Sequence, residues 1–95
     1  MQKYDVIILQ HSTTRQPVPS DAIAFHRRLL ANSYEEAARK ALPQITKEIL
    51  PTVDPTIKYV SLYIGKLNPT ARALRLAPIF RVDLEGNLYR GFTKI

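Results

Sequence analysis

One segment of the chain has the spacing of an amphipathic helix, and this limits what the rest can fold into. Ser33 can cap the helix, while Glu36, three residues later, completes a capping box and is spaced to pair with Lys40. Pro43 has no N–H for the carbonyl four residues earlier, so we expect a kink there. The apolar residues that recur at helical spacing are Tyr34, Ala38, Ala41, Leu42, Ile45 and Ile49. A helix with one apolar face needs an apolar sheet beneath it.

Two other segments have strand-like patterns. Residues 3–11, KYDVIILQH, are apolar on both faces, as in a central strand with neighbours on each side. In residues 58–66, KYVSLYIGK, alternate side chains face opposite ways. Val60, Leu62 and Ile64 fall on one side, and Tyr59, Ser61 and Tyr63 on the other. This strand therefore has one face suited to the core and one face bearing two tyrosines.

Residues 22–31, AIAFHRRLLA, fit either a strand or a helix. As a strand, Ile23, Phe25, Leu29 and Ala31 share a face that is interrupted only by Arg27. As a helix after Ser20 and Asp21, the residues Ala22, Phe25 and Leu29 line up instead. We favour the strand, because the cap at Ser33 indicates a new helix and the first strand needs a partner.

The C-terminal third predicts a hairpin with a defined register. In IFRVDLEGNLYRGF, Asp83 can begin a type I turn, with Gly86 in the left-handed position of a three-residue loop. Pairing Asp83 with Asn87 then sets three cross-strand neighbours: Val82 with Leu88, Arg81 with Tyr89, and Phe80 with Arg90. The register places Phe80, Val82 and Leu88 on the core side.

These elements predict an α+β fold in a single domain, residues 1–95. We expect an antiparallel or mixed sheet of about five strands with one amphipathic helix on one face, in the order ββαβββ. The alternative is βααβββ, with residues 21–31 helical.

The chain has no cysteine, and its early apolar run, Val6 to Leu9, is too short for a signal or spanning segment. We expect a cytoplasmic protein that does not enter membranes.

The net charge of +6 is unevenly distributed. In residues 33–50 three basic and three acidic residues cancel, whereas residues 66–94 hold six basic residues against two acidic ones, a balance of +4. Such a charge favours polyanionic partners, although many basic proteins use it only for solubility.

The face opposite the predicted core carries the main candidate binding residues. The hairpin register places Arg81 beside Tyr89, close enough for a cation–π contact, on the same face as Tyr59 and Tyr63. His26 and Arg28 extend this face on the second strand. Rings among cations could stack bases of single-stranded DNA or RNA while arginines meet phosphates. The same pattern is also typical of cross-strand packing and of protein interfaces.

Further basic residues could meet phosphates at the end of this strand and just beyond it. Lys66 ends the tyrosine-bearing strand, and Arg72 and Arg75 lie three apart in LNPTARALRL, where we expect a turn or short helix. Two solvated arginines in a loop would give the same pattern.

The sequence offers little for catalysis. It has no P-loop, no dinucleotide fingerprint and no nucleophile elbow, and the two histidines, His11 and His26, are too far apart for a helical metal pair. We therefore expect no enzyme, no cofactor and no metal site.

Two functions remain. The first is an interaction module that binds a protein partner or a second copy through an uncovered sheet face or edge strand. The second is a single-stranded nucleic-acid-binding accessory protein.

Overall fold

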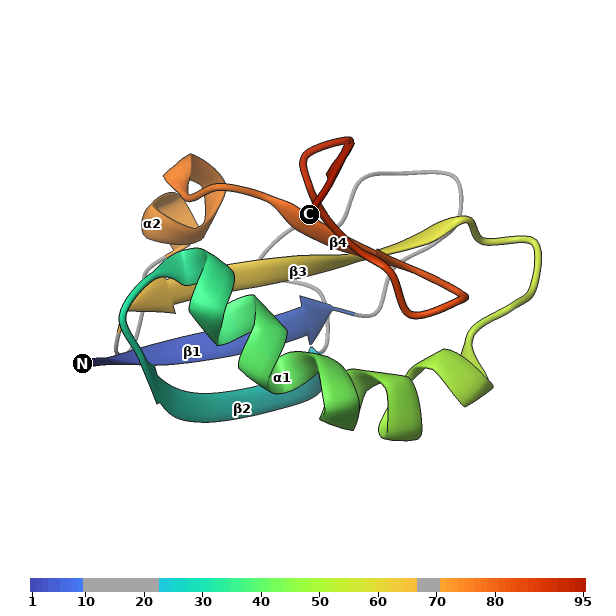
Figure 1. Ribbon diagram of the computed structural model, residues 1–95, viewed down its shortest axis with the longest axis horizontal. Helices are drawn as coiled ribbons and strands as arrows, with labels where there is room; N and C mark the ends of the chain where they lie inside the picture. The colour runs from blue at the N-terminus through green and yellow to red at the C-terminus, as the bar shows by residue number, and fades with distance from the viewer. Residues whose placement is uncertain (10–22, 67–70) are drawn as a thin grey trace.

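The computed structural model describes residues 1–9, 23–66 and 71–95, which form one six-stranded antiparallel sheet with a helix across it (Figure 1). Along the chain the elements are β1 (Gln2–Leu9), β2 (Ile23–Ala31), α1 (Tyr34–Glu48), the 3₁₀ turn η1 (Leu50–Thr52), β3 (Tyr59–Lys66), α2 (Ala71–Leu76), β4 (Phe80–Asp83), β5 (Leu88–Arg90) and β6 (Thr93–Lys94). The strands lie in the order β2-β1-β3-β4-β5-β6. The predicted α+β class and the order ββαβββ are confirmed, with a short helix and a short sixth strand added.

The ambiguous segment is a strand. β2 pairs antiparallel with β1, with Phe25 opposite Ile8 and Arg27 opposite Val6. β1 also pairs with β3 on its other side, so it is the central strand that its two apolar faces indicate. The helical alternative for residues 21–31 is therefore wrong over residues 23–31. Apolar contact with α1 on one side and the pairing with β1 favour the extended form.

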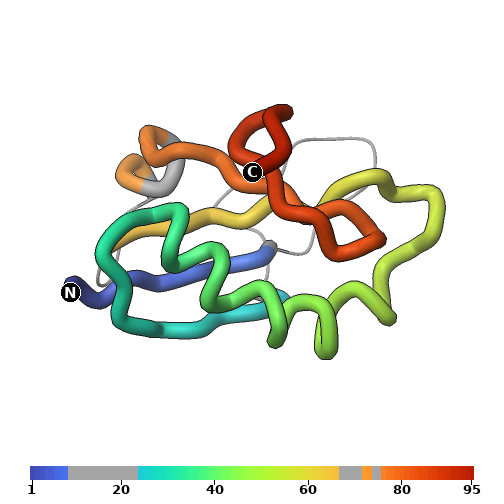
Figure 2. The backbone as a smooth tube through the Cα atoms, viewed as in Figure 1, coloured from blue at the N-terminus to red at the C-terminus, as the bar shows by residue number. Residues whose placement is uncertain are grey.

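α1 begins as the capping box predicts. The Ser33 side chain accepts a hydrogen bond from the backbone N–H of Glu36 at 3.1 Å, and Glu36 lies 3.2 Å from the Lys40 ammonium. The helix continues through Pro43, which is exposed on its outer side. Figure 2 follows the chain from the end of α1 through η1 to the start of β3.

The core lies between α1 and one face of the sheet. Ala37, Ala38 and Ala41 are fully or almost fully buried, and their small side chains let the helix approach the strands closely. The strand residues buried opposite them are Val6, Ile8, Phe25, Val60, Leu62, Ile64, Phe80, Val82 and Leu88. We call this the helix face of the sheet and the opposite side the reverse face.

The predicted hairpin is present with the predicted register. Gly86 has φ of +87°, its N–H donates to the Asp83 carbonyl, and Asp83 and Asn87 close the loop through a 3.0 Å backbone bond. Val82 faces Leu88, Arg81 faces Tyr89 and Phe80 faces Arg90. In the described part of the chain, no helix is long and apolar enough to cross a membrane.

Candidate functional site

The reverse face places two of the predicted binding residues, Arg81 and Tyr89, in one row across four strands. Ser61 on β3 pairs with Arg81 on β4, Arg81 pairs with Tyr89 on β5, and Tyr89 pairs with Lys94 on β6. Because paired residues in a sheet share a face, all four side chains project to the reverse side. Tyr59, two residues before Ser61, lies on the same face and pairs with Asp83.

The two tyrosines at this end are held in fixed positions. The rings of Tyr59 and Tyr89 meet edge to face, with centroids 5.5 Å apart. The Tyr89 hydroxyl donates to Asp83 Oδ2 at 2.9 Å. This hydrogen bond, the nearby negative charge and partial desolvation raise the pKa of Tyr89 above its ordinary value of 10.0. Tyr89 is therefore a neutral, oriented ring across the physiological pH range.

Asp83 organises this end of the hairpin. Its Oδ1 accepts from the backbone N–H groups of Glu85 and Asn87, and its Oδ2 accepts from the Asn87 side-chain amide as well as from Tyr89. Burial opposes ionisation, but these hydrogen bonds together outweigh it and hold the pKa of Asp83 below its ordinary value. With four donors already on its oxygens, the carboxylate serves the turn.

Arg81 stacks on a ring, although not the expected one. Its guanidinium carbon lies 4.3 Å from the centroid of Phe92, and Nη1 donates to the Gly91 carbonyl at 2.8 Å. The predicted contact partner was Tyr89, which is the correct cross-strand neighbour but turns its ring toward Tyr59. The turn between β5 and β6, with Gly91 at φ of +61°, brings Phe92 back over Arg81.

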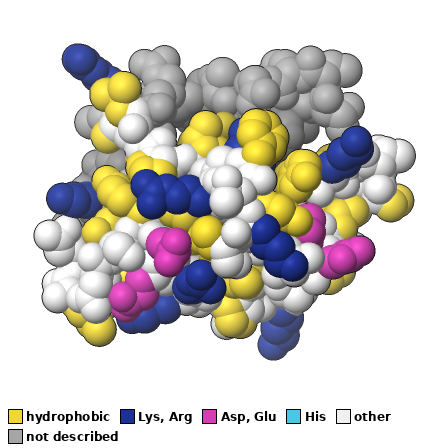
Figure 3. Space-filling model, turned by 45° about the horizontal axis from the view of Figure 1, so that its top comes forward, with side chains coloured by type: hydrophobic (Ala, Val, Ile, Leu, Met, Phe, Trp, Pro, Cys, Tyr) yellow, Lys and Arg dark blue, Asp and Glu magenta, His cyan; other side chains and the backbone are white. Residues whose placement is uncertain are grey.

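Three apolar side chains are exposed at this end of the sheet. Phe92 is 79% exposed, Ile79 39% and Tyr59 37%. Ile79 precedes β4 by one residue and has the same alternation as Arg81, so it also lies toward the reverse face. Figure 3 looks on the helix side and the top of the molecule, where hydrophobic side chains are interspersed with Lys and Arg. We call Tyr59, Ile79, Arg81, Tyr89 and Phe92 the aromatic surface.

Tyr63 does not belong to this surface. The expectation that it is available for contact is wrong, because only 8% of the residue is exposed and it packs with Ile7 in a small cluster separate from the main core. Tyr63 faces Ile7 across the β1–β3 pair, on the reverse side. The reverse face is therefore partly covered, and the Tyr59–Tyr63 pair cannot act as adjacent stacking positions.

His26 and Arg28 form a second cluster on the reverse face. Both approach the same oxygen of Asp5, His26 Nε2 at 2.9 Å and Arg28 Nε at 3.0 Å, and Asp5 is only 2% exposed. A buried carboxylate needs such partners, since an unpaired charge in the interior is costly. The two side chains are each more than 40% exposed, but their inner ends hold β2 to β1. We therefore assign this pair mainly to structure.

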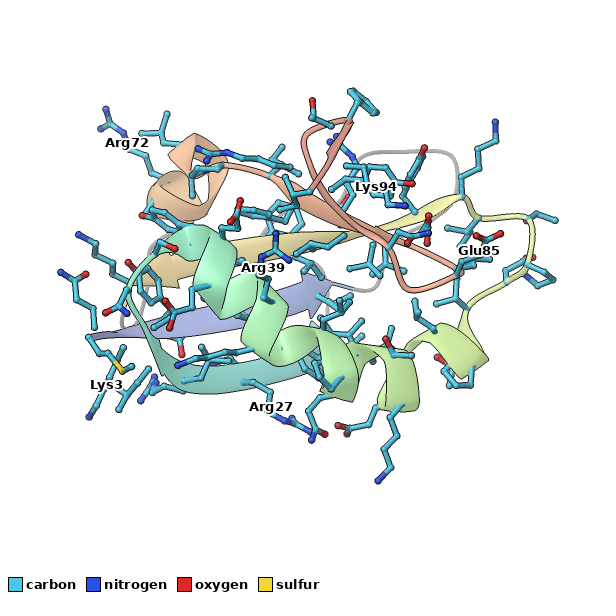
Figure 4. The ribbon with its side chains drawn as sticks, in the orientation of Figure 1. Lys3, Arg27, Arg39, Arg72, Glu85 and Lys94 are labelled. Atoms are coloured by element: carbon cyan, nitrogen blue, oxygen red, sulfur yellow. The ribbon has the colours of Figure 1, made fainter. Side chains whose placement is uncertain are left out.

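The remaining predicted phosphate contacts are scattered. Lys66 is exposed but follows the alternation of Ile64, so it lies toward the helix face at the end of β3. Arg72 is exposed on α2 and projects away from the sheet (Figure 4). Arg75 lies in α2, as expected of a short helix, and its side chain is outside the described part of the structure. These residues do not form one site with the aromatic surface.

A shallow pocket of about 360 Å³ adjoins the aromatic surface at Tyr59. It lies between the segment before β3 and the β4–β5 turn, and its lining is Pro55, Ile57, Lys58, Tyr59, Asp83, Leu84 and Glu85. The lining is mixed, with one lysine and two carboxylates, those of Asp83 and Glu85, among otherwise apolar or aromatic side chains. Among the described residues, no group of three or more histidine, aspartate or glutamate side chains could hold a metal ion.

Phe92 and Ile79 are exposed apolar residues of the aromatic surface that the sequence analysis did not identify. The signal for Phe92 was the dipeptide Gly91-Phe92 after a hairpin strand, because a glycine at the first position of a two-residue turn is typical of a second hairpin. A residue in such a turn lies between the two strands, so the alternation along a strand did not assign Phe92 to either face. Compared with protein-family models, curated proteins and solved structures, the chain gives no significant match in any of the three.

Proposed function

We propose that this domain is a non-catalytic interaction module whose aromatic surface binds a protein partner. The observation that carries the proposal is Phe92, whose large apolar ring is 79% exposed and fixed by the guanidinium of Arg81. Exposed aromatic rings beside an arginine are the residue types enriched at the centres of protein interfaces. A ring needed only for folding would be expected to face the core.

The charge around this surface indicates the chemistry of the partner. The Arg81 guanidinium contacts Phe92, Lys94 follows on the reverse face of β6, and the Asp83 carboxylate is already engaged by four donors. A partner with an apolar anchor and acidic residues around it would complement this arrangement. Electrostatic attraction would then act mainly on the association rate, and the apolar anchor on the dissociation rate.

The test compares Phe92→Ser with Leu30→Ser in quantitative capture experiments and then in titrations with the captured partner. Leu30 is a matched control, because it is 50% exposed on the same reverse face but on β2. We expect Phe92→Ser to weaken binding at least about tenfold and Leu30→Ser to leave it nearly unchanged. A partner that tolerates Phe92→Ser would overturn the proposal.

A second candidate is binding of single-stranded nucleic acid, which the stacked Arg81–Phe92 pair and the +4 balance of residues 66–94 favour. The burial of Tyr63 removes one of its expected stacking positions. The test is an anisotropy titration of labelled single-stranded and double-stranded oligonucleotides across a salt series. Preferential single-strand binding should fall with log salt at a slope of about 0.7 per neutralised phosphate, and Phe92→Ser should weaken it without altering the slope. Absence of saturable binding at low salt would exclude this candidate.

A further inference from the structure

β2 forms one outer edge of the sheet. It runs for nine residues, pairs with β1 on one side, and has no partner on its other side among the described strands. A long edge strand presents backbone N–H and C=O groups that can pair with another chain. The opposite edge is β6, which has only two residues. β2 is therefore the longer edge, and a strand added to it could form more backbone hydrogen bonds than a strand added to β6.

Two carbonyl oxygens of β2 are occupied by basic side chains. Arg27 Nη1 donates to the His26 carbonyl at 2.9 Å, and Lys40 Nζ, from α1, donates to the Leu30 carbonyl at 2.7 Å. Residues four apart in a strand point their carbonyls to the same side. Figure 4 shows the Arg27 side chain on the side of β2 away from β1. Both carbonyls thus face the outer edge.

Each basic side chain is itself held in place by a glutamate of α1. Arg27 Nη2 lies 2.9 and 2.8 Å from the two carboxylate oxygens of Glu48, and Lys40 lies 3.2 Å from Glu36. The helix therefore positions two cations along the outer edge of β2. These contacts also explain why Arg27 interrupts the otherwise apolar face of this strand.

We propose that Arg27 and Lys40 close the β2 edge and prevent a second copy of this chain from extending the sheet there. The second copy is the occupant to exclude, because antiparallel pairing of β2 with itself would join two nine-residue edges of equal length. Such pairing needs the carbonyls of His26 and Leu30 as acceptors, and it would bring Arg27 and Lys40 of one copy close to those of the other. This closure is independent of the aromatic surface, which lies at the other end of the sheet.

The experiment removes both donors while keeping the apolar stems. In Arg27→Met/Lys40→Met we expect concentration-dependent dimers by sedimentation equilibrium, with an association constant at least about tenfold above that of the wild-type chain. The matched control is Arg39→Met/Lys47→Met, which makes the same change in charge and hydrophobicity on exposed positions of α1. This control should behave as the wild type.

A third variant locates the interface. Leu30→Pro, added to Arg27→Met/Lys40→Met, removes an outward N–H without taking a bond from the β1 ladder, and it should restore the monomer. The proposal is overturned if the double variant is as monomeric as the wild type, if the control dimerises equally, or if Leu30→Pro leaves the dimer intact. A wild-type dimer that Leu30→Pro dissociates would overturn it as well. Circular dichroism verifies folding, and the single variants Arg27→Met and Lys40→Met replace the double variant if that one unfolds.

Discussion

Asp83 and Gly86 fix the hairpin between β4 and β5 through different physical effects. Asp83 supplies acceptors for the loop donors, while Gly86 supplies a backbone conformation that other residues rarely adopt. Because both effects are local in sequence, the turn type and the register could be predicted from a few letters. The burial of Tyr63 could not, since alternation along a strand tells which way a side chain points and not what lies against it.

Replacing Gly86 should test the conformational part. Gly86→Ala should lower the free energy of unfolding by about 1 to 2 kcal/mol, the cost of a left-handed conformation for a residue with a Cβ. A Cβ at this position would meet only Thr46 Oγ1, at an ordinary 3.7 Å, so crowding adds little. Gly86→Asn should lose less, because asparagine tolerates this region. Urea denaturation gives both values, and equal losses for the two variants would argue against a conformational cause.

The hydrogen bonds of Asp83 should make stability depend on pH in the acid range. Its pKa is lowered in the folded chain, so the folded state binds the proton less tightly than the unfolded state does. The contribution is complete above the unfolded pKa, near 3.8, and is lost as pH falls through the folded pKa. Urea unfolding at a series of pH values should show a smaller acid loss for Asp83→Asn than for the wild type. Parallel curves would contradict this origin.

Among the elements, those with local signals could be predicted directly, while those with long-range causes were ambiguous or missed. The Ser33 cap and the apolar stripe predicted α1, and alternation predicted β3. β6 and the Arg81–Phe92 stack were missed, because both depend on the second turn at Gly91 folding back onto β4. Residues 23–31 were decided by pairing with β1, which no periodicity within the segment could supply.

Pro43 within α1 offers a test at this scale. It lies on the exposed side of the helix, where its ring leaves the Arg39 carbonyl without the usual helical donor. Pro43→Ala should stabilise the domain by about 2 kcal/mol, since proline costs about 3 kcal/mol in a helix interior and restricts the unfolded chain by up to about 1. Thermal and urea unfolding would measure this gain. A loss of stability would mean that Pro43 itself is needed for α1 to fit the sheet.

The whole molecule is joined by contacts between distant parts of the chain. β1 pairs with β3, where Tyr4 faces Lys66, and α1 contacts strands from both halves of the sheet, including β2 and β5. Because α1 packs on strands of both halves, we expect cooperative two-state unfolding. Helix loss by far-ultraviolet circular dichroism and exposure of the buried Tyr4 and Tyr63 by tyrosine fluorescence should coincide. Separate midpoints would indicate that the two halves melt independently.

Phe92 lies in a two-residue turn and contacts the guanidinium of Arg81. That guanidinium also donates a hydrogen bond to the Gly91 carbonyl of the same turn. A ring on a long loop would surrender much of its rotational freedom on capture, and that entropy would be subtracted from the affinity. Here most of that ordering is already complete before any encounter. Arg81→Ala removes this contact, and it should weaken binding through a more unfavourable binding entropy, even for a ligand that does not contact residue 81.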